Sequence, residues 1–164
     1  MVRAVVAPLF VVVALLGAAC SKPVDLKKAL SIAEINAGYF DAGIVDGRNK
    51  LVPSVTFKLK KSIDDDLRPL SLNVAFKRLP APGAGEEDFD ESFIQGITFN
   101  GSETAPITVR PKAGYTGDPP QSRADMLKNS QFRDIRVHVF AKHGSAQWTE
   151  IGTVDLPRHL IVQP

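Results

Sequence analysis

The sequence predicts a mainly β protein: an antiparallel immunoglobulin-like sandwich of about seven or eight strands with one short helix. Apolar and polar residues alternate with a period of two through most of the chain after residue 30, which is typical of strands that turn one face to a core. Turn signals rich in Gly, Pro, Asn and Asp separate these short stretches. Such spacing favours a sandwich, although a small barrel would give the same pattern.

The predicted strands follow one another from residue 31 to residue 156. They span 31–40, 52–60, 70–78, 92–99, 105–110, 133–142 and 148–156. The clearest is 52–60, where Val55, Phe57 and Leu59 alternate with polar residues. Because only a short polar connection separates 52–60 from 70–78, we predict that these two strands pair as an antiparallel hairpin, with one face on the core and one in water.

Proline and glycine mark the irregular points of these strands. Pro53 cannot donate a hydrogen bond to a neighbouring strand, so it is expected at the start of its strand or on a sheet edge. Gly96 is a predicted β-bulge, and Asn100-Gly101 predicts a tight turn.

Two long irregular stretches, 79–91 and 111–121, are predicted to be exposed loops because proline and glycine break the alternation in both. The short helix is predicted after the second loop, capped by Ser122 and ending near Asn129.

Residues 1–20 have the three parts of a secretory signal peptide. Arg3 supplies the early positive charge, an apolar run covers 4–16, and small residues at 17–19 precede Cys20. The run is shorter than the roughly 20 residues that a membrane-spanning helix needs. We therefore predict an apolar signal helix that is removed from the mature protein.

Small residues directly before Cys20 resemble the lipobox of bacterial lipoproteins. The resemblance implies that Cys20 takes a diacylglyceryl group on sulfur and becomes the new N-terminus. Ser21 in the next position implies sorting to the outer membrane if the cell has one. The alternatives are a plainly cleaved secreted protein and an uncleaved anchor.

Length and composition fit one exported domain. We assign 21–30 to a tether and 31–164 to the β domain, which is long enough for a core of its own. The single cysteine rules out a disulfide within the chain. A formal net charge of +2 gives no field that points to nucleic acid.

The segment SVTFKLKKSIDDDLRPLSLNVAFKRL, residues 54–79, resembles the strand–polar loop–strand core of FxLYD-type β-sandwich domains of bacterial envelope proteins. The stretches AGYFDAGIVDGRNKLVPSVTFKL, GYTG and FAKHGSAQW are also similar to uncharacterised bacterial lipoproteins. The likeness implies a shared fold and an envelope location, and it implies no activity.

Carboxylates cluster in the predicted loop 79–91 and at Asp64–Asp66. A flexible acidic loop could bind Ca²⁺, which takes six to eight oxygen ligands. The spaced Asp-x-Asp-x-Asp-Gly pattern is missing, however, so solvated loops are the expectation for both clusters, and no metal is predicted.

Histidine and serine give no catalytic or zinc pattern. His138, His143 and His159 are too far apart in the sequence for a recognisable zinc site. Ser145 follows His143 and Gly144, but this is not a Gly-x-Ser-x-Gly elbow. We therefore predict no catalytic residues, no cofactor and no enzyme activity.

Aromatic residues give the only hint of a contact surface. Tyr115 lies in the predicted loop 111–121, and Trp148, Tyr39 and Phe140 could join it as a platform for a glycan or a partner protein. The alternation that buries Val137 and Val139 turns Phe140 outward. The usual place for the single Trp of a sandwich is between the sheets, so burial is the expectation for Trp148.

We expect a lipid-anchored protein of the bacterial cell envelope with a non-enzymatic binding or assembly role. Its expected partners are the membrane, through Cys20, and an envelope protein. One alternative is a glycan- or peptidoglycan-binding module, which requires an exposed Tyr115 or Trp148. The other is a small envelope enzyme or metal protein, which requires His and carboxylate groups to converge in a cleft.

Overall fold

The computed structural model describes residues 24–80 and 84–161. The signal peptide, Cys20 and the first part of the predicted tether lie outside these residues. Among the described helices, none has the length and apolar character to cross a membrane.

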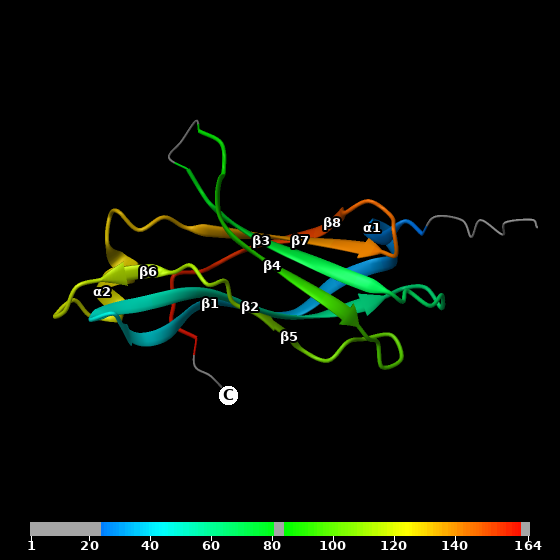
Figure 1. Cartoon of the computed structure of the whole chain (residues 1–164), viewed down its shortest axis with the longest axis horizontal. Helices are drawn as coiled ribbons and strands as arrows, with labels where there is room; N and C mark the ends of the chain where they lie inside the picture. Colours follow the sequence, from blue (N-terminus) through cyan, green and yellow to red (C-terminus); the bar gives the residue numbers. More distant parts are fainter. Residues whose placement is uncertain (1–23, 81–83, 162–164) are drawn as a thin grey trace, which may run out of the picture.

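The described chain is mainly β, with eight antiparallel strands in two sheets and two short helices (Figure 1). The first sheet holds β1 (Leu30–Val45), β2 (Arg48–Lys61), β5 (Ile107–Val109) and β6 (Tyr115–Gly117), with β2 in its centre. The second sheet has the order β4 (Glu87–Ile97), β3 (Leu70–Arg78), β7 (Ile135–His143) and β8 (Thr149–Asp155). The helices are α1 (Leu26–Ala29) and α2 (Arg123–Lys128).

The hydrophobic core lies between the two sheets, because alternate residues of each central strand point into it. Apart from Tyr39 of β1, the largest fully buried side chains come from the three central strands: Leu51, Val55, Phe57 and Leu59 of β2, Leu70, Leu72, Val74 and Phe76 of β3, and Ile135, Val137 and Val139 of β7. The alternation predicted from the sequence is therefore confirmed for these strands.

The predicted hairpin of 52–60 with 70–78 is wrong. The first segment lies in β2 of the first sheet and the second in β3 of the second sheet, and the connection between them crosses from one layer to the other. Both segments do bury an apolar face. Alternation reports which face is buried, but strands that face each other across a core alternate in the same way as strands that pair within a sheet.

Pro53 lies inside β2 rather than at its start. Its partner on β1 is Tyr39, whose N–H and C=O bond to the chain near the C-terminus, at His159 and Ile161. The pair is therefore one of the non-hydrogen-bonded pairs of the β1–β2 ladder, and Pro53 turns its nitrogen to the opposite edge. There it falls between the stretches that pair with β5 and β6, so no hydrogen bond is lost.

Several elements extend beyond their predicted limits. β1 continues to Val45 and ends in a hairpin turn at Asp46-Gly47, where both residues have the positive φ that a type I′ turn requires. β4 begins at Glu87, so the end of the predicted loop 79–91 is strand. β6 lies within the predicted loop 111–121.

The described chain has two short helices, whereas the predicted fold has one. α2 has the predicted cap, since the Ser122 side chain accepts a hydrogen bond from the Asp125 N–H. α1 is the additional helix and lies in the segment assigned to the tether; its Leu26 and Ala29 are buried in the core.

One end of the molecule, which we call the α1 end, gathers four segments. They are α1 and the connections 62–69, 98–106 and 144–148. Ser62 Oγ donates to the Lys28 carbonyl over 3.0 Å, and the Gly144 N–H donates to the Pro69 carbonyl over 2.9 Å. Figure 1 shows these segments at the right, with the β1–β2 hairpin at the opposite end.

Candidate binding surface

The outer face of the second sheet carries an aromatic patch made of Phe93, Phe140 and Trp148. Asn73 of β3 pairs with Phe93 of β4 on one side and with Phe140 of β7 on the other, so the three residues share one face. The ring of Trp148, directly before β8, lies 6.0 Å from the ring of Phe93. Phe93 is 58% exposed and Trp148 is 38% exposed.

The patch agrees with the sequence prediction at Phe140 and departs from it at Trp148. Phe140 faces outward, as the alternation of β7 predicts. Trp148, expected between the sheets, lies on the outer face instead. Its position follows from the β7–β8 turn, which brings it opposite Lys142, one of the residues of β7 that face outward. The Lys142 ammonium lies 5.1 Å from the indole ring.

Phe93 was not predicted as a contact residue. The signal for it was weak, because Phe93-Ile94 are both apolar and the phase of the alternation in 92–99 is ambiguous. Ile94 packs against the core and leaves Phe93 outward. The bulge predicted at Gly96 is present, with a positive φ and a register shift between β3 and β4.

His138 extends the patch with a polar cluster. Its ring stacks on Phe140 at 6.3 Å and 17°. Its Nε2 lies 2.8 Å from Glu86 Oε2 and its Nδ1 lies 3.2 Å from Glu150 Oε1. Both ring nitrogens therefore face a carboxylate on the surface of the sheet.

Arg136, on the next outward position of β7, holds two carboxylates. It donates to both carboxylate oxygens of Asp155, at 2.6 and 3.1 Å, and to Glu86 at 3.1 Å. The hydrogen bonds from Arg136 lower the pKa of Asp155 below its usual range. The outer face is thus a row of aromatic groups continued by a charged network.

Four of the acidic residues of 86–91 are spread over β4, and Glu86 directly precedes the strand, so they are not gathered in a loop. Asp88 pairs with Lys77, and Glu91 accepts a hydrogen bond from Asn73. Asp90 accepts from the backbone N–H groups of Ala113 and Glu91, and these hydrogen bonds lower its pKa. In the other acidic cluster, the side chain and backbone of Arg68 lower the pKa of Asp66 to about 2.

The three histidines remain apart: His138 is in the patch, His143 is near Arg68 in the α1 end, and His159 is near the C-terminus. Within residues 24–80 and 84–161, no three His, Cys, Asp or Glu side chains are placed to hold a metal ion. Ser145 is exposed in the β7–β8 turn.

Tyr115 does not belong to the patch. It lies in β6, with its ring 4.2 Å from that of Phe132 and stacked on Phe89 at 5.4 Å. Its hydroxyl donates to the Arg133 carbonyl over 2.7 Å, and burial raises its pKa. Tyr39 packs against the same group from the core, so these two residues do not form an exposed platform with Trp148.

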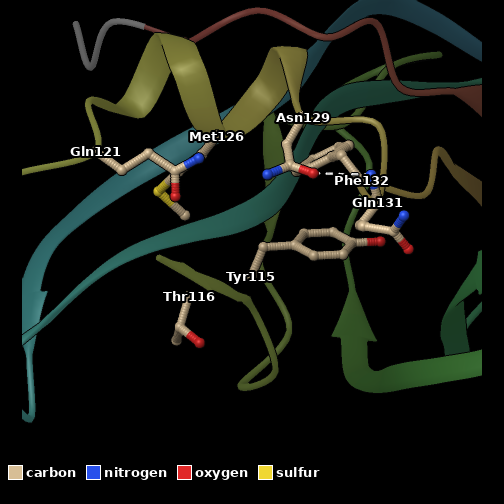
Figure 2. Close-up of a pocket in the computed structure, with 7 residues that line it drawn as sticks. All are labelled: Tyr115, Thr116, Gln121, Met126, Asn129, Gln131 and Phe132. Atoms are coloured by element: carbon tan, nitrogen blue, oxygen red, sulfur yellow. Dashed lines mark hydrogen bonds between the residues drawn. The ribbon is translucent and has the colours of Figure 1, made fainter. Parts of the chain in front are cut away.

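Tyr115 and Phe132 also line a small pocket between β6 and α2, of about 180 Å³. Figure 2 shows the two rings together on one side and Gln121 and Met126 on the other. The side chain of Asn129 accepts a hydrogen bond from the Gln131 N–H at its rim. The residues that line the pocket are thus held by packing and hydrogen bonds to their neighbours, and we assign the pocket no ligand.

No protein-family model, no curated protein and no solved structure matches the chain.

Proposed function

We propose that this chain is an exported lipoprotein of the bacterial cell envelope, anchored through Cys20, with a binding or assembly role and no catalytic activity. The leader at 1–20 and the small residues before the cysteine support the anchor. Two or three acyl chains together would hold the domain stably at a membrane. Ser21 favours the outer membrane.

The strand order supports an immunoglobulin-like sandwich. In that fold the second strand lies between the first and the fifth, and the sixth lies between the third and the last. Here β2 lies between β1 and β5, and β7 lies between β3 and β8, with the short β6 as an addition. The same strand order is compatible with the proposed likeness to FxLYD-type envelope domains. That likeness suggests no catalytic site for this chain.

The exposed aromatic patch is the observation that carries the binding role. Phe93, Phe140 and Trp148 stand on a sheet face whose other residues are mainly polar or charged, where the fold itself requires no aromatic group. Aromatic residues dominate the energy of protein interfaces, and charged groups at the rim, such as Arg136 and Glu150, set their specificity. A partner that covers the patch removes this apolar surface from water.

A glycan-binding role is the second candidate, and the exposure of Trp148 is the observation that favours it. Sugar rings stack on exposed aromatic faces, and the exposed Glu91 carboxylate on the same face would accept hydrogen bonds from sugar hydroxyls. The packing of Tyr115 removes one of the two residues on which this alternative depends.

Site-specific photo-crosslinking in cells tests the binding role. We expect a crosslinker at Glu150, beside Phe140, to capture a partner, and the adduct to disappear in the Phe140→Ala variant. The matched control is a crosslinker at Asn36, exposed on the outer face of the first sheet. The same adducts at both positions, or adducts that survive Phe140→Ala, would contradict the proposal. The Cys20→Ala variant tests the anchor separately, because it should lose acylation and leave the membrane fraction.

A further inference from the structure

The anchor and the aromatic patch meet at one end of the molecule. Only three residues, 21–23, separate Cys20 from Val24, the first described residue. A fully extended chain spans at most about 3.6 Å per residue, so the Val24 Cα lies within about 14 Å of the Cys20 Cα. An acylated Cys20 therefore keeps the α1 end next to the bilayer surface.

Trp148 lies beside the point where the chain leaves the domain. Val24 and Leu26 line one open hollow, of about 870 Å³, together with Ser145 and Thr149. Thr149 directly follows Trp148 in the chain. Trp148 itself does not line the hollow. It belongs to the α1 end because it is the last residue of the 144–148 connection, and its ring reaches Phe93, 6.0 Å away on the outer face.

We propose that Phe93 and Trp148 dock on the headgroup region of the membrane that holds the anchor, so that lipid is the partner of this part of the patch. The inference rests on the proposed function, because it requires acylated Cys20. Trp is enriched at membrane interfaces, where its ring meets the acyl boundary and its N–H stays among polar groups. Phe93 adds apolar surface beside it.

Charge contributes less than the aromatic rings. Lys142 lies against Trp148, and Lys27 and Lys28 are exposed on α1. The same end carries the cationic groups Lys61 and Arg68 and the carboxylates Asp25, Asp64, Asp65, Asp66 and Glu103. Since the two signs nearly balance, we expect docking to persist at high salt, unlike binding by a basic cluster.

Docking at this end would leave the rest of the outer face free. The outward residues of β7 run from Lys142 through Phe140 and His138 to Arg136, at about 3.3 Å per residue. Arg136 would then stand up to about 20 Å farther from the bilayer than Lys142, the full distance applying to a strand perpendicular to the membrane. Phe140 lies level with Phe93, because both pair with Asn73, so the part of the face left to an envelope partner is the charged network at His138 and Arg136.

Fluorescence quenching tests this orientation, because Trp148 is the single Trp of the chain. The full-length acylated protein would be reconstituted into phosphatidylethanolamine–phosphatidylglycerol vesicles, with and without brominated acyl chains. We expect a blue-shifted Trp148 emission that brominated lipid quenches at least about twofold, both at low salt and in 0.5 M NaCl.

The matched control moves the fluorophore along the same face. Thr153 is exposed on β8 opposite His138, about 16 Å along the strand from position 148. The Trp148→Phe/Thr153→Trp double variant should float with the vesicles and show little quenching, and its melting temperature reports whether it folds as the parent does.

The outcomes separate the two proposals. A chain that floats with the vesicles while Trp148 stays unquenched keeps the anchor and overturns the docking, as does equal quenching at positions 148 and 153. If Trp148 is instead buried by a co-purified protein or protected by a glycan, the patch has another partner and the docking is wrong. A chain that does not float overturns the anchor itself and the docking with it.

Discussion

The outer faces of the two sheets differ although both follow the same alternation. On the first sheet, Thr56 and Thr108 share a 2.8 Å hydrogen bond, and Lys60 pairs with Glu103 at 2.8 Å. The aromatic residue there, Phe40, is covered by the Arg110 guanidinium 4.0 Å from its ring. The second sheet leaves Phe93 and Trp148 exposed, even though the Lys142 ammonium lies 5.1 Å from the indole ring.

This difference separates what the fold needs from what it leaves free. Each sheet must bury one face, and both do so with Val, Leu, Ile and Phe. Neither sheet needs an aromatic group on its other face. The first sheet has hydroxyl groups and ion pairs there, and its exposed apolar side chains, Ile35, Ile44 and Val45 of β1, are aliphatic. The exposed aromatic rings of the second sheet are best explained by a contact outside the domain.

The largest expected effect is a difference in stability between variants on the two faces of the second sheet. Phe76 on the inner face of β3 is 1% exposed, whereas Phe93 on the outer face of β4 is 58% exposed. Phe76→Ala should lower the free energy of unfolding by about 3–5 kcal/mol, because it leaves a cavity in the core. Phe93→Ala should change it by less than about 0.5 kcal/mol.

Urea unfolding of the two variants measures both values. If Phe93→Ala destabilises the domain as much as Phe76→Ala does, the ring is part of the packing and the patch is not a surface held ready for a partner. A loss confined to Phe76→Ala supports the division between the two faces.

The sequence predicts this division wherever its alternation is unambiguous. β7 shows the clean case, since its four inward residues are buried and Phe140 faces outward as expected. Phe93 could not be predicted because Ile94 beside it gives the opposite phase. The pairing of strands was also beyond the pattern: β2 and β3 have matching apolar faces, and only the tertiary structure shows that they meet across the core.

Trp148 and Tyr115 both differ from the sequence prediction: Trp148 is exposed on the outer face, and Tyr115 is packed against other aromatic rings. Loop composition suggested exposure of Tyr115, but β6 pairs with β2 and brings its ring onto Phe132. The general preference of a single Trp for the core suggested burial of Trp148, but its position after the β7–β8 turn puts it on the outward phase. In both cases long-range contacts decided the outcome.

A smaller effect concerns a polar contact that joins the two layers. Asp90 of β4 accepts a 2.9 Å hydrogen bond from the Ala113 N–H, in the segment that leads to β6 of the first sheet. The native state lowers the Asp90 pKa below the ordinary 3.8. Its contribution to stability is therefore complete above the unfolded-state pKa and is lost as the pH falls through the lower native value.

The Asp90→Asn variant should lose about 1 kcal/mol at pH 7, since it removes a charge-assisted hydrogen bond to the backbone. The difference from the parent protein should shrink as the pH falls below about 4 and vanish when Asp90 is protonated in both states. Urea unfolding across this pH range measures it. A difference that stays constant with pH would mean that the carboxylate charge does not hold the two layers.

The smallest expected effect concerns the hydrogen bond between Thr56 and Thr108 on the outer face of the first sheet. Thr56→Val or Thr108→Val alone should cost about 0.5–1 kcal/mol, because one hydroxyl loses its partner. The double variant should cost less than the two single variants added together, since it leaves neither hydroxyl unpaired and β-branched residues suit strands. Crosslinking at Glu150 should be unchanged in all three variants, because these residues lie on the opposite layer. If the double variant instead abolishes capture at Glu150, the outer face of the first sheet takes part in binding. The first sheet would then not be the solvent-facing layer, and the difference between the two outer faces would need another explanation.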